Sequence, residues 1–402
     1  MILFLHNRYR TTGGEERVVD DLAWLVREQL GEPARILTRD SKALGGRRAA
    51  AGLLRGGLEP EEVAAAVRGG GARVVHAHNL QPTLGWRALA AARAEGARIV
   101  VHLHQYRLVC AVGVCFTQGQ ECTRCHGRNT LPGVLRNCRG SRAQALAYGA
   151  GLALWQRRLL EQADAVVVPS VFARERLRAL GAPLPWERVH VLAPPVRALA
   201  GSAAGEGSGS EELDPLLGAS RSASGSPAST LDLPRPYALL VARLSPEKGI
   251  DVAIDACRRA GIGLVVAGAG PEYAALVDRA RGAEVHFVGR VEDARLAQLR
   301  AGAALALVPS RSAETFGLAA AEAMAAGLPV AASRVGALPE LVGAEGLATP
   351  GDERALAQAI ERLLADSGAG ARALERVRTV CAPEVVAAGL AELYGAAAEL
   401  VP

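Results

Sequence analysis

Two glutamates in the second half of the chain, Glu314 and Glu322, have the spacing and the surroundings of a ligand site. They lie eight residues apart, about two helical turns, behind the apolar run Leu305–Val308 and a polar loop. The first N–H groups of a helix that begins in this loop lack intrahelical partners and attract anions. These groups belong to Phe316, Gly317 and Leu318. We expect a phosphate at the helix start, sugar hydroxyls at Glu314 and a ribose at Glu322.

Taken alone, such a pair of glutamates is more often a helix cap and a solvated surface residue. Here the order of strand, loop and helix favours a ligand site instead. Ligands of open parallel sheets bind at the carboxyl ends of the strands, where the helix N-termini point.

Two cations lie in a second loop of the same half. The apolar run Ala238–Val241 leads into a segment with Arg243 and Lys248, five residues apart. A guanidinium and an ammonium together neutralise a diphosphate, above all when it becomes a leaving group. The alternative is two ordinary solvated cations. Composition weakens that alternative, because the chain has 46 basic residues and only Lys42 and Lys248 among them are lysines.

Two further turns of the second half are candidate donor contacts. A Gly-x-Gly turn with Gly270 follows the strand predicted at Leu264–Ala267. It is a weak dinucleotide fingerprint, because Tyr273 occupies the third glycine position. Arg290 and Val291 follow the next predicted strand and would bring backbone groups to the edge of a base.

The first half offers two candidates of its own. Gly13 and Gly14 open a helix after the loop that follows the apolar run Ile2–Leu5, which places unpaired N–H groups at a cleft. A plain turn with capping carboxylates has the same pattern. His104 follows the strand predicted at Ile99–Leu103, where an imidazole can orient or polarise a substrate hydroxyl.

Five of the seven cysteines crowd into a short segment of the first half. One C-x2-C knuckle stands between two single cysteines, and four thiolates in this arrangement can hold a tetrahedral zinc ion. The candidate ligands are Cys110, Cys122, Cys125 and Cys138. Only one knuckle is present, so a structural zinc site, thiols without metal, and disulfides all remain open.

The elements that must position these groups form two sets. Both halves alternate short apolar runs with helical patterns, which predicts two doubly wound parallel sheets, each a Rossmann-like α/β domain. A chain of 402 residues, half of them apolar, can build two cores. We expect an acceptor-side domain at 1–198 with a cysteine-rich insertion at 105–140, a flexible Gly/Ser/Ala-rich linker at 199–230, a donor domain at 231–384 and a last helix in 385–402.

The second half resembles the family 4 retaining glycosyltransferases of the GT-B superfamily. The resemblance rests on the E-x7-E segment from Glu314 to Glu322, with Phe-Gly-Leu inside it, and on the Arg-Leu and Glu-Lys-Gly around Arg243 and Lys248. Ala242 stands where the family usually has Gly. The resemblance is weaker at Gly13 and Gly14 and around His104. At these places the family has a glycine pair and a histidine that contacts the transferred sugar.

The resemblance implies a GT-B fold, with two domains facing a cleft and the last helix packed back on the first domain. It implies transfer of a hexosyl group from a UDP- or GDP-linked sugar to a hydroxyl of a glycan, a lipid-linked or a small-molecule acceptor, with retention and without a catalytic metal. His104, Arg243, Lys248 and Glu314 would then be catalytic. The alternatives are another GT-B enzyme, an epimerase or a phosphorylase, and a non-catalytic nucleotide-sugar-binding scaffold.

Charge and hydropathy limit the other partners. The net charge of +5 is mild, and no basic run is interleaved with aromatic residues, which argues against nucleic acid. No secretory signal precedes Ile2–Leu5, which predicts a cytoplasmic protein. The apolar run Ala143–Leu154 with the basic end Trp155–Arg158 is typical of a core helix, and it also fits peripheral contact with a membrane.

Overall fold

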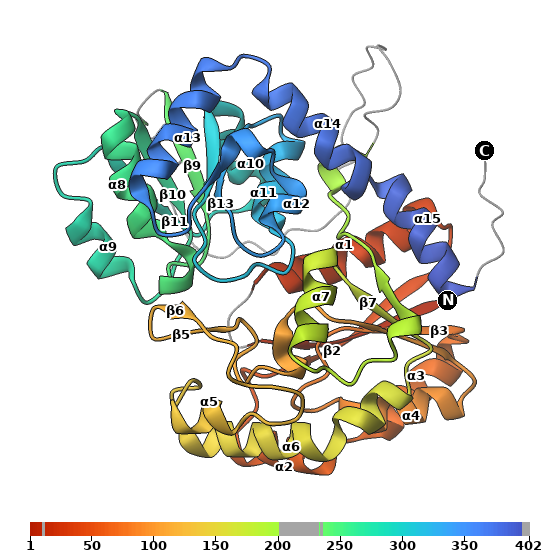
Figure 1. Cartoon of the computed structure of the whole chain (residues 1–402). Helices are drawn as coiled ribbons and strands as arrows, with labels where there is room; N and C mark the ends of the chain where they lie inside the picture. The colour runs from red at the N-terminus through yellow and green to blue at the C-terminus, as the bar shows by residue number, and fades with distance from the viewer. Residues whose placement is uncertain (10–12, 201–232, 234–235, 396–402) are drawn as a thin grey trace, which may run out of the picture.

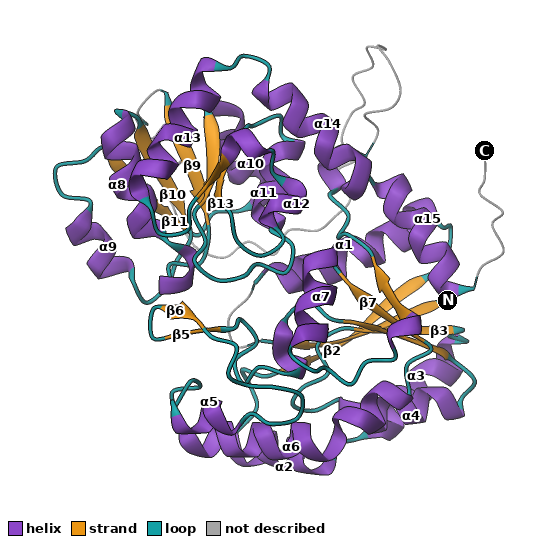
Figure 2. Cartoon of the chain, in the orientation of Figure 1, coloured by secondary structure: helices purple, strands orange, loops and turns teal. Residues whose placement is uncertain are grey.

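The computed structural model describes residues 1–9, 13–200, 233 and 236–395. They form two α/β lobes, the first from the N-terminal half of the chain and the second from the C-terminal half (Figures 1 and 2). Each lobe has one six-stranded sheet in which every pairing is parallel. The predicted pair of doubly wound parallel sheets is therefore confirmed.

The first sheet has the strand order β2-β1-β3-β4-β7-β8. Its strands are β1 (Ile2–Arg8), β2 (Ala34–Asp40), β3 (Val74–Ala77), β4 (Arg98–His102), β7 (Ala165–Val168) and β8 (Val189–Val191). Four helices, α3 (Pro60–Gly70), α4 (Gly85–Ala94), α6 (Arg142–Glu161) and α7 (Val171–Ala179), share one apolar core with one face of this sheet. On the other face, α1 (Gly14–Gln29) and α15 (Pro383–Tyr394) pack together.

The position of α15 ties the end of the described chain to the first sheet. Val386, Leu390 and Tyr394 are buried in the same cluster as Val18 and Leu22 of α1. The helix ends at Tyr394, because Gly395 adopts the left-handed conformation with φ of 67°. The helix expected in 385–402 is thus shorter than the sequence pattern suggested, and residues 396–402 lie outside the described part.

The second sheet has the order β11-β10-β9-β12-β13-β14. Its strands are β9 (Tyr237–Val241), β10 (Gly263–Ala267), β11 (Val285–Gly289), β12 (Leu305–Val308), β13 (Val330–Ser333) and β14 (Leu347–Ala348). Helices α8 (Ile250–Ala260) and α13 (Glu353–Ala365) share an apolar cluster with this sheet, and α11 (Leu318–Ala325) and α14 (Ala369–Cys381) share another. The shorter α9 (Tyr273–Arg279), α10 (Asp293–Gly302) and α12 (Leu338–Leu341) complete the lobe.

The segment after β4 has little regular structure. It contains η1 (Tyr106–Leu108), the two-stranded hairpin β5 (Phe116–Thr117) and β6 (Gln120–Glu121), and α5 (Leu131–Leu135). Figure 1 shows the hairpin on the side of the first lobe that faces the second, while α5 lies beside α6 and α2 (Gly46–Arg55).

Several elements were not expected from the sequence. Strand β2 carries charged residues on a half-exposed edge of the sheet, so its apolar signal is weak. Helices α2, α3, α7 and α14 and the two-residue β14 were also missed. The predicted linker at 199–230 falls almost wholly within 201–232, outside the described residues. Among the described helices, none has both the length and the apolarity needed to cross a bilayer.

Candidate active site between the two lobes

The loops that carry the predicted donor residues meet because of the strand order. Strands β9 and β12 are neighbours in the second sheet, although β10 and β11 come between them in the chain. The sheet therefore reverses its strand order at this point, and ligands of open α/β sheets bind in the crevice outside such a switch point. The loop after β9 contains Arg243 and Lys248, and the loop after β12 contains Glu314.

Lys248 and Glu314 form an ion pair across these two loops. The distance from Lys248 Nζ to Glu314 Oε1 is 2.6 Å, and the Ser310 hydroxyl donates to the same oxygen at 2.6 Å. Burial raises the pKa of the Glu314 carboxyl, but the charge of Lys248 and the two hydrogen bonds outweigh it and hold that pKa below its ordinary value. Glu314 is therefore an ionised hydrogen-bond acceptor at neutral pH.

Two glycines allow this close approach of the loops. Gly249 ends η4 (Pro246–Lys248) with φ of 65°, and a Cβ atom there would lie 2.1 Å from the carbonyl oxygen of Pro309. Gly336 has φ of 63°, and a Cβ atom would lie 2.4 Å from the backbone nitrogen of Glu314. Any larger residue at either position would push one loop away from its neighbour.

Arg243 is held by side chains of its own loop. Its Nη2 pairs with Glu247 Oε1, and its Nε donates to Ser245 Oγ at 3.3 Å. The Arg243 side chain is 51% exposed, and a guanidinium has five N–H donors, so these two contacts leave capacity for an anionic ligand. Arg243 and Lys248 thus lie in one loop, but each has a carboxylate partner of its own.

The N-termini of two helices, one from each lobe, lie against each other. Helix α1 begins at Gly14 and α11 begins at Leu318, and a Cβ atom on Gly14 would lie 3.3 Å from the Leu318 side chain. Gly317 caps α11 with φ of 103°, which favours glycine. The N–H of Gly13 is already used, because it donates to Glu16 Oε2 at 2.8 Å. Helix α11 was predicted to begin near Phe316, and it begins two residues later, at Leu318.

His104 reaches the donor loop through its backbone. The hydroxyl of Thr315 donates to the carbonyl oxygen of His104 at 2.8 Å, and Ser170 at the start of α7 donates to the carbonyl of Thr315 at 2.7 Å. The backbone N–H groups of Val171 and Phe172 donate to the carboxylate of Glu340 from the second lobe. The first lobe therefore contacts the loop that carries Glu314 directly.

Glu322, predicted to face a ribose, has two arginine partners. It pairs with Arg300 of its own lobe, and the distance from its Oε1 to Arg17 Nε of α1 is 2.9 Å. Arg17 also binds Asp293 of the second lobe at 2.9 Å. The carboxylate thus links the lobes in this structure, and a ribose at Glu322 would have to displace or share the Arg17 contact.

The remaining predicted donor contacts lie on the loops after β10 and β11. A Cβ atom on Gly270 would lie 2.2 Å from the carbonyl oxygen of Leu244, so this glycine packs against the loop of Arg243. Arg290 and Val291 follow β11 at the sheet edge, where Arg290 is exposed and Val291 is partly buried.

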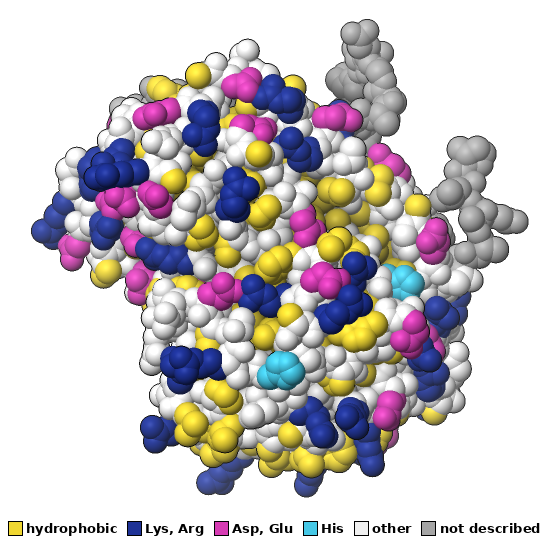
Figure 3. Space-filling model, viewed as in Figure 1, with side chains coloured by type: hydrophobic (Ala, Val, Ile, Leu, Met, Phe, Trp, Pro, Cys, Tyr) yellow, Lys and Arg dark blue, Asp and Glu magenta, His cyan; other side chains and the backbone are white. Residues whose placement is uncertain are grey.

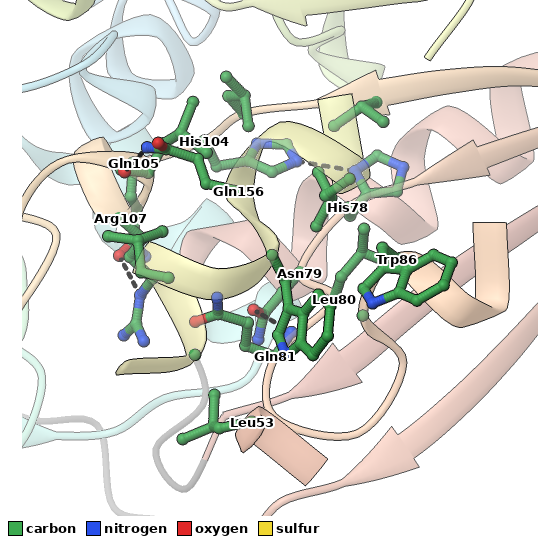
Figure 4. A pocket seen from close by; sticks show the side chains of 18 of the residues that line it. Leu53, His78, Asn79, Leu80, Gln81, Trp86, His104, Gln105, Arg107 and Gln156 are labelled. Carbon is green, nitrogen blue, oxygen red and sulfur yellow. Dashed lines mark hydrogen bonds between the residues drawn. The ribbon is translucent and has the colours of Figure 1, made fainter. Parts of the chain in front are cut away.

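A cavity of the first lobe opens beside His104 (Figure 4), and its space, together with the solvent at its open mouth, amounts to about 820 Å³. Much of its wall is apolar, from residues of α2, α4 and α6 and the β3 and β4 ends, including Leu53, Leu80, Trp86, Leu152, Trp155 and Leu159. Polar groups gather at the side of His104: Gln105, whose Oε1 accepts from Arg107 Nε at 3.0 Å, and Glu15.

Glu15 was not singled out from the sequence, because its place in the first turn of a helix resembles ordinary capping. Its side chain lines the cavity and accepts a hydrogen bond from the Tyr9 hydroxyl at 2.8 Å. Burial, only partly offset by His6, Tyr9 and Arg107, raises the pKa of Glu15 to about 7. A carboxyl with this pKa can accept or donate a proton near neutral pH.

His104 is one of four histidines that lie close together. They come from the ends of β3 and β4: His76, His78, His102 and His104. One ring nitrogen of His78 lies 2.7 Å from Nε2 of His104, and Nδ1 of His76 lies 2.7 Å from the Tyr394 hydroxyl. The register of the sheet creates this group, because Ala77 of β3 pairs with Val101 of β4. Sequence spacing showed two H-x-H segments but not their proximity.

Three of these rings also satisfy the distance condition for a metal. Within the described part of the chain, His76, His78 and His102 each place a ring nitrogen within 4.8 Å of the others. The Nδ1 atoms of His76 and His78 take part in the hydrogen bonds with Tyr394 and His104.

The four predicted zinc ligands lie around one small cavity of the cysteine-rich segment. Its wall includes Cys110, Cys122, Cys125 and Cys138. All seven cysteines are free thiols. Cys115 lies outside this wall and is hydrogen-bonded to Cys110.

Comparison with known proteins defines the class. Residues 9–195 match the family model of the glycosyl transferase 4-like domain, and residues 235–366 match that of glycosyl transferases group 1. D-inositol 3-phosphate glycosyltransferase of Xylanimonas cellulosilytica is 30% identical over 73% of this chain and 72% of its own length. The chain belongs to the group 1 glycosyltransferases of the family 4 type.

Other relatives match over shorter regions. Glycogen synthase of Mycobacterium tuberculosis is 37% identical over 40% of this chain and 42% of that protein. A GDP-mannose-dependent phosphatidylinositol dimannoside mannosyltransferase of the same species is 40% identical over 30% of this chain and 34% of its own. The matched regions thus span less than half of these two proteins.

Solved structures confirm the GT-B fold. HepE of Anabaena in complex with UDP has a TM-score of 0.60 at 17% identity, covering 99% of this chain and 100% of that one. Sucrose-phosphate synthase of Thermosynechococcus elongatus has a TM-score of 0.63 at 21% identity, covering 98% of each chain. At these identities the likeness shows the shared fold.

The histidine group leads to a prediction on pH. Burial, and after it the neighbouring imidazoles, lowers the pKa of all four rings, that of His76 to about 3. In the unfolded chain the histidines bind protons near pH 6.5. The contribution of the neutral, buried rings to the free energy of unfolding is therefore complete above that pH, and each ring loses about 1.4 kcal/mol of it per pH unit as the pH falls. Glu15 and Asp21, whose pKa values burial raises to about 7 and about 6, act in the opposite direction.

We therefore expect the pH slope of stability, between about pH 6.5 and pH 5, to be smaller in His102→Gln than in wild type by about 1.4 kcal/mol per pH unit. Both ring nitrogens of His102 lack a hydrogen-bond partner in the described structure, so the variant removes no such bond. Urea denaturation at several pH values measures the slope. His190→Gln, at an exposed position, is the control. Equal slopes in all three proteins would contradict the prediction.

Proposed function

We propose that this chain is a retaining hexosyltransferase that uses a UDP- or GDP-linked sugar and transfers the sugar to a hydroxyl of an acceptor. One observation carries the proposal: the Lys248–Glu314 pair lies at the switch point of the second sheet, beside the facing N-termini of α1 and α11. Cations and helix starts attract a diphosphate, and an ionised carboxylate accepts hydrogen bonds from sugar hydroxyls.

In this proposal each donor part has its own partner. Arg243, Lys248 and the start of α11 at Gly317 and Leu318 hold the diphosphate. Glu314 holds the sugar. Glu322 releases its ion pair with Arg17 and binds the ribose instead. Gly270, Arg290 and Val291 face the nucleoside, while Gly13 and Gly14 complete the site from the first lobe. The anionic donor thus replaces interactions that these groups make with one another.

The chemistry follows from the charges. As the bond from the sugar to the diphosphate breaks, negative charge grows on the leaving oxygen, where Arg243, Lys248 and the helix start stabilise it. The sugar carbon develops oxocarbenium character, and the leaving diphosphate takes the proton of the acceptor hydroxyl on the same face, which retains the configuration. This chemistry needs no catalytic metal.

The acceptor side of the proposal rests on the cavity beside His104. Its polar groups, His104, Gln105 and Glu15, are placed to orient a hydroxyl, and its wall of leucine and tryptophan suits an apolar portion of the acceptor. Among glycan, small-molecule and lipid-linked acceptors, the wall favours a lipid-linked one. The contact of Thr315 with His104 supports a reaction that takes place where the lobes touch.

Release of nucleoside diphosphate distinguishes this proposal from the alternatives. A transferase releases it in step with glycosylated acceptor. An epimerase or a phosphorylase converts its substrate without that dependence, and a scaffold binds the donor without turnover.

Lys248→Ala and Glu314→Ala test the donor site. We expect each to lower kcat/KM by at least about a hundredfold, because each removes a charged contact worth about 3 kcal/mol in the transition state. Acceptor-dependent release of nucleoside diphosphate is the readout. Lys42→Ala and Glu361→Ala, at exposed positions, are the matched controls. Turnover like wild type in either site variant, with the fold verified by circular dichroism, would refute the assignment.

We further propose peripheral contact with an anionic membrane at the cytoplasmic face, through α2, α5 and α6. These helices expose leucines, at Leu54, Leu131, Leu135, Leu146 and Leu154. They also expose arginines, at Arg47, Arg48, Arg55, Arg142, Arg157 and Arg158, against one acidic residue, Glu161. Figure 3 shows apolar and basic side chains together along the lower edge of the molecule. Such a surface binds lipid through both apolar burial and charge.

Vesicle flotation tests this contact. We expect wild type to float with vesicles that contain phosphatidylglycerol, less so with pure phosphatidylcholine, and less at high salt because salt screens the arginines. The double variant Leu146→Ser/Leu154→Ser should lose at least about half of the binding, since each apolar contact contributes to the interface. The control, Leu364→Ser/Val380→Ser, removes apolar residues of similar exposure from the second lobe. Equal flotation of both double variants would contradict the proposed surface.

A further inference from the structure

We propose that Cys110, Cys122, Cys125 and Cys138 bind one structural zinc ion that ties the cysteine-rich segment together. The first observation is the cavity itself. Four separate parts of the segment meet there, namely the turn after η1, the C-x2-C knuckle, the start of α5 and the turn after α5 that carries Cys138, and each contributes to the wall. The cysteines in that wall are the four whose spacing fits a tetrahedral site.

The fifth cysteine of the segment shows that the grouping is selective. Cys115 is equally close in the chain and is 1% exposed, but it does not line the cavity. Its φ of 49° lies in the left-handed region and turns the chain into the β5–β6 hairpin. Its contact with the group is the hydrogen bond to Cys110, and it is not part of the cavity wall.

Backbone N–H groups point at two of the four sulfurs. The N–H groups of Val112 and Gly113, two and three residues after Cys110, point at its sulfur, and those of Ala111 and Gly133 point at the sulfur of Cys125. Such N–H donors stabilise negative charge on metal-bound sulfur. Arg136 lines the same cavity and adds a positive charge near four thiolates.

The segment has little regular structure of its own. Between β4 and α6 its regular structure consists of η1, a hairpin of two-residue strands and the five-residue α5. Its start packs into the core of the lobe through Tyr106, Leu108 and Val109. The rest has little regular structure, and such segments are commonly held by a metal or by disulfides. This segment continues from His104, Gln105 and Arg107, so zinc would fix the side of the acceptor cavity that those residues form.

Zinc binding must draw the cavity walls inward. Among the described residues, cysteine sulfurs are not grouped as closely as the nitrogens of His76, His78 and His102. Bonds of about 2.3 Å from zinc to each sulfur require a tighter cluster than the wall now forms. The histidine group is therefore the competing site that an experiment has to separate from the cysteines.

Metal analysis of untagged full-length protein, purified without chelator, tests the proposal. We expect about one zinc ion per chain by mass spectrometry of the metal, and less than about 0.2 in Cys125→Ser. Cys115→Ser and His102→Gln, the matched controls, should keep the metal. Zinc that survives Cys125→Ser but is lost in His102→Gln would overturn the assignment, as would a metal-free wild type.

A second measurement covers the case in which Cys125→Ser does not fold. Wild-type protein is alkylated under native conditions before and after removal of metal by a chelator, and the modified cysteines are identified by mass spectrometry. We expect Cys110, Cys122, Cys125 and Cys138 to become reactive together only after chelation. Four thiols that react equally before chelation, or a disulfide among them, would refute zinc. The metal content is independent of turnover, so this result stands whether or not transferase activity is found.

Discussion

The ion pair between Lys248 and Glu314 is the contact on which the arrangement of the donor half depends. It joins the loops after β9 and β12, two strands that are adjacent in the sheet but distant in the chain. Burial alone would favour a protonated Glu314, and Lys248 and Ser310 reverse that preference. Gly249 and Gly336 permit the approach, because a side chain at either position would collide with the neighbouring loop. Charge and backbone conformation thus fix the same geometry.

The two lobes meet through interactions that a donor would disturb. Arg17 of α1 reaches Glu322 and Asp293, while Glu340 accepts from the backbone at the start of α7. These contacts join the two lobes. Binding of a diphosphate between the starts of α1 and α11 would place an anion at the N-termini of both helices, where each helix dipole has its positive end. We therefore regard lobe contact and donor binding as one linked process.

The sequence was most informative where function and local structure coincide. The strand, loop and helix around Glu314 could be predicted because the apolar run, the polar loop and Gly317 are consecutive in the chain. The same holds for Lys248, which stands out because it is one of only two lysines in the chain. Both parallel sheets were predicted from alternating apolar runs and helical patterns, whereas β2 was missed because its charged, half-exposed edge has no such signal.

Contacts between distant segments could not be predicted in this way. The histidine group depends on the register of β3 against β4, and the arginine partners of Glu322 depend on how the lobes meet. Glu15 looked like a capping residue, and only its burial in the cavity wall sets it apart. The grouping of four cysteines and the exclusion of Cys115 likewise required the fold of the segment.

Thermal denaturation of the whole chain with a panel of UDP- and GDP-linked sugars tests the central claim most directly. A ligand that binds only the folded state stabilises it by about 2.7 kcal/mol at a concentration of 100 times its Kd. We expect one nucleotide sugar to raise the Tm of wild type and to leave that of Lys248→Ala nearly unchanged. A Tm that no nucleotide sugar raises, or an equal rise in both proteins, would contradict a donor site built on Lys248 and Glu314.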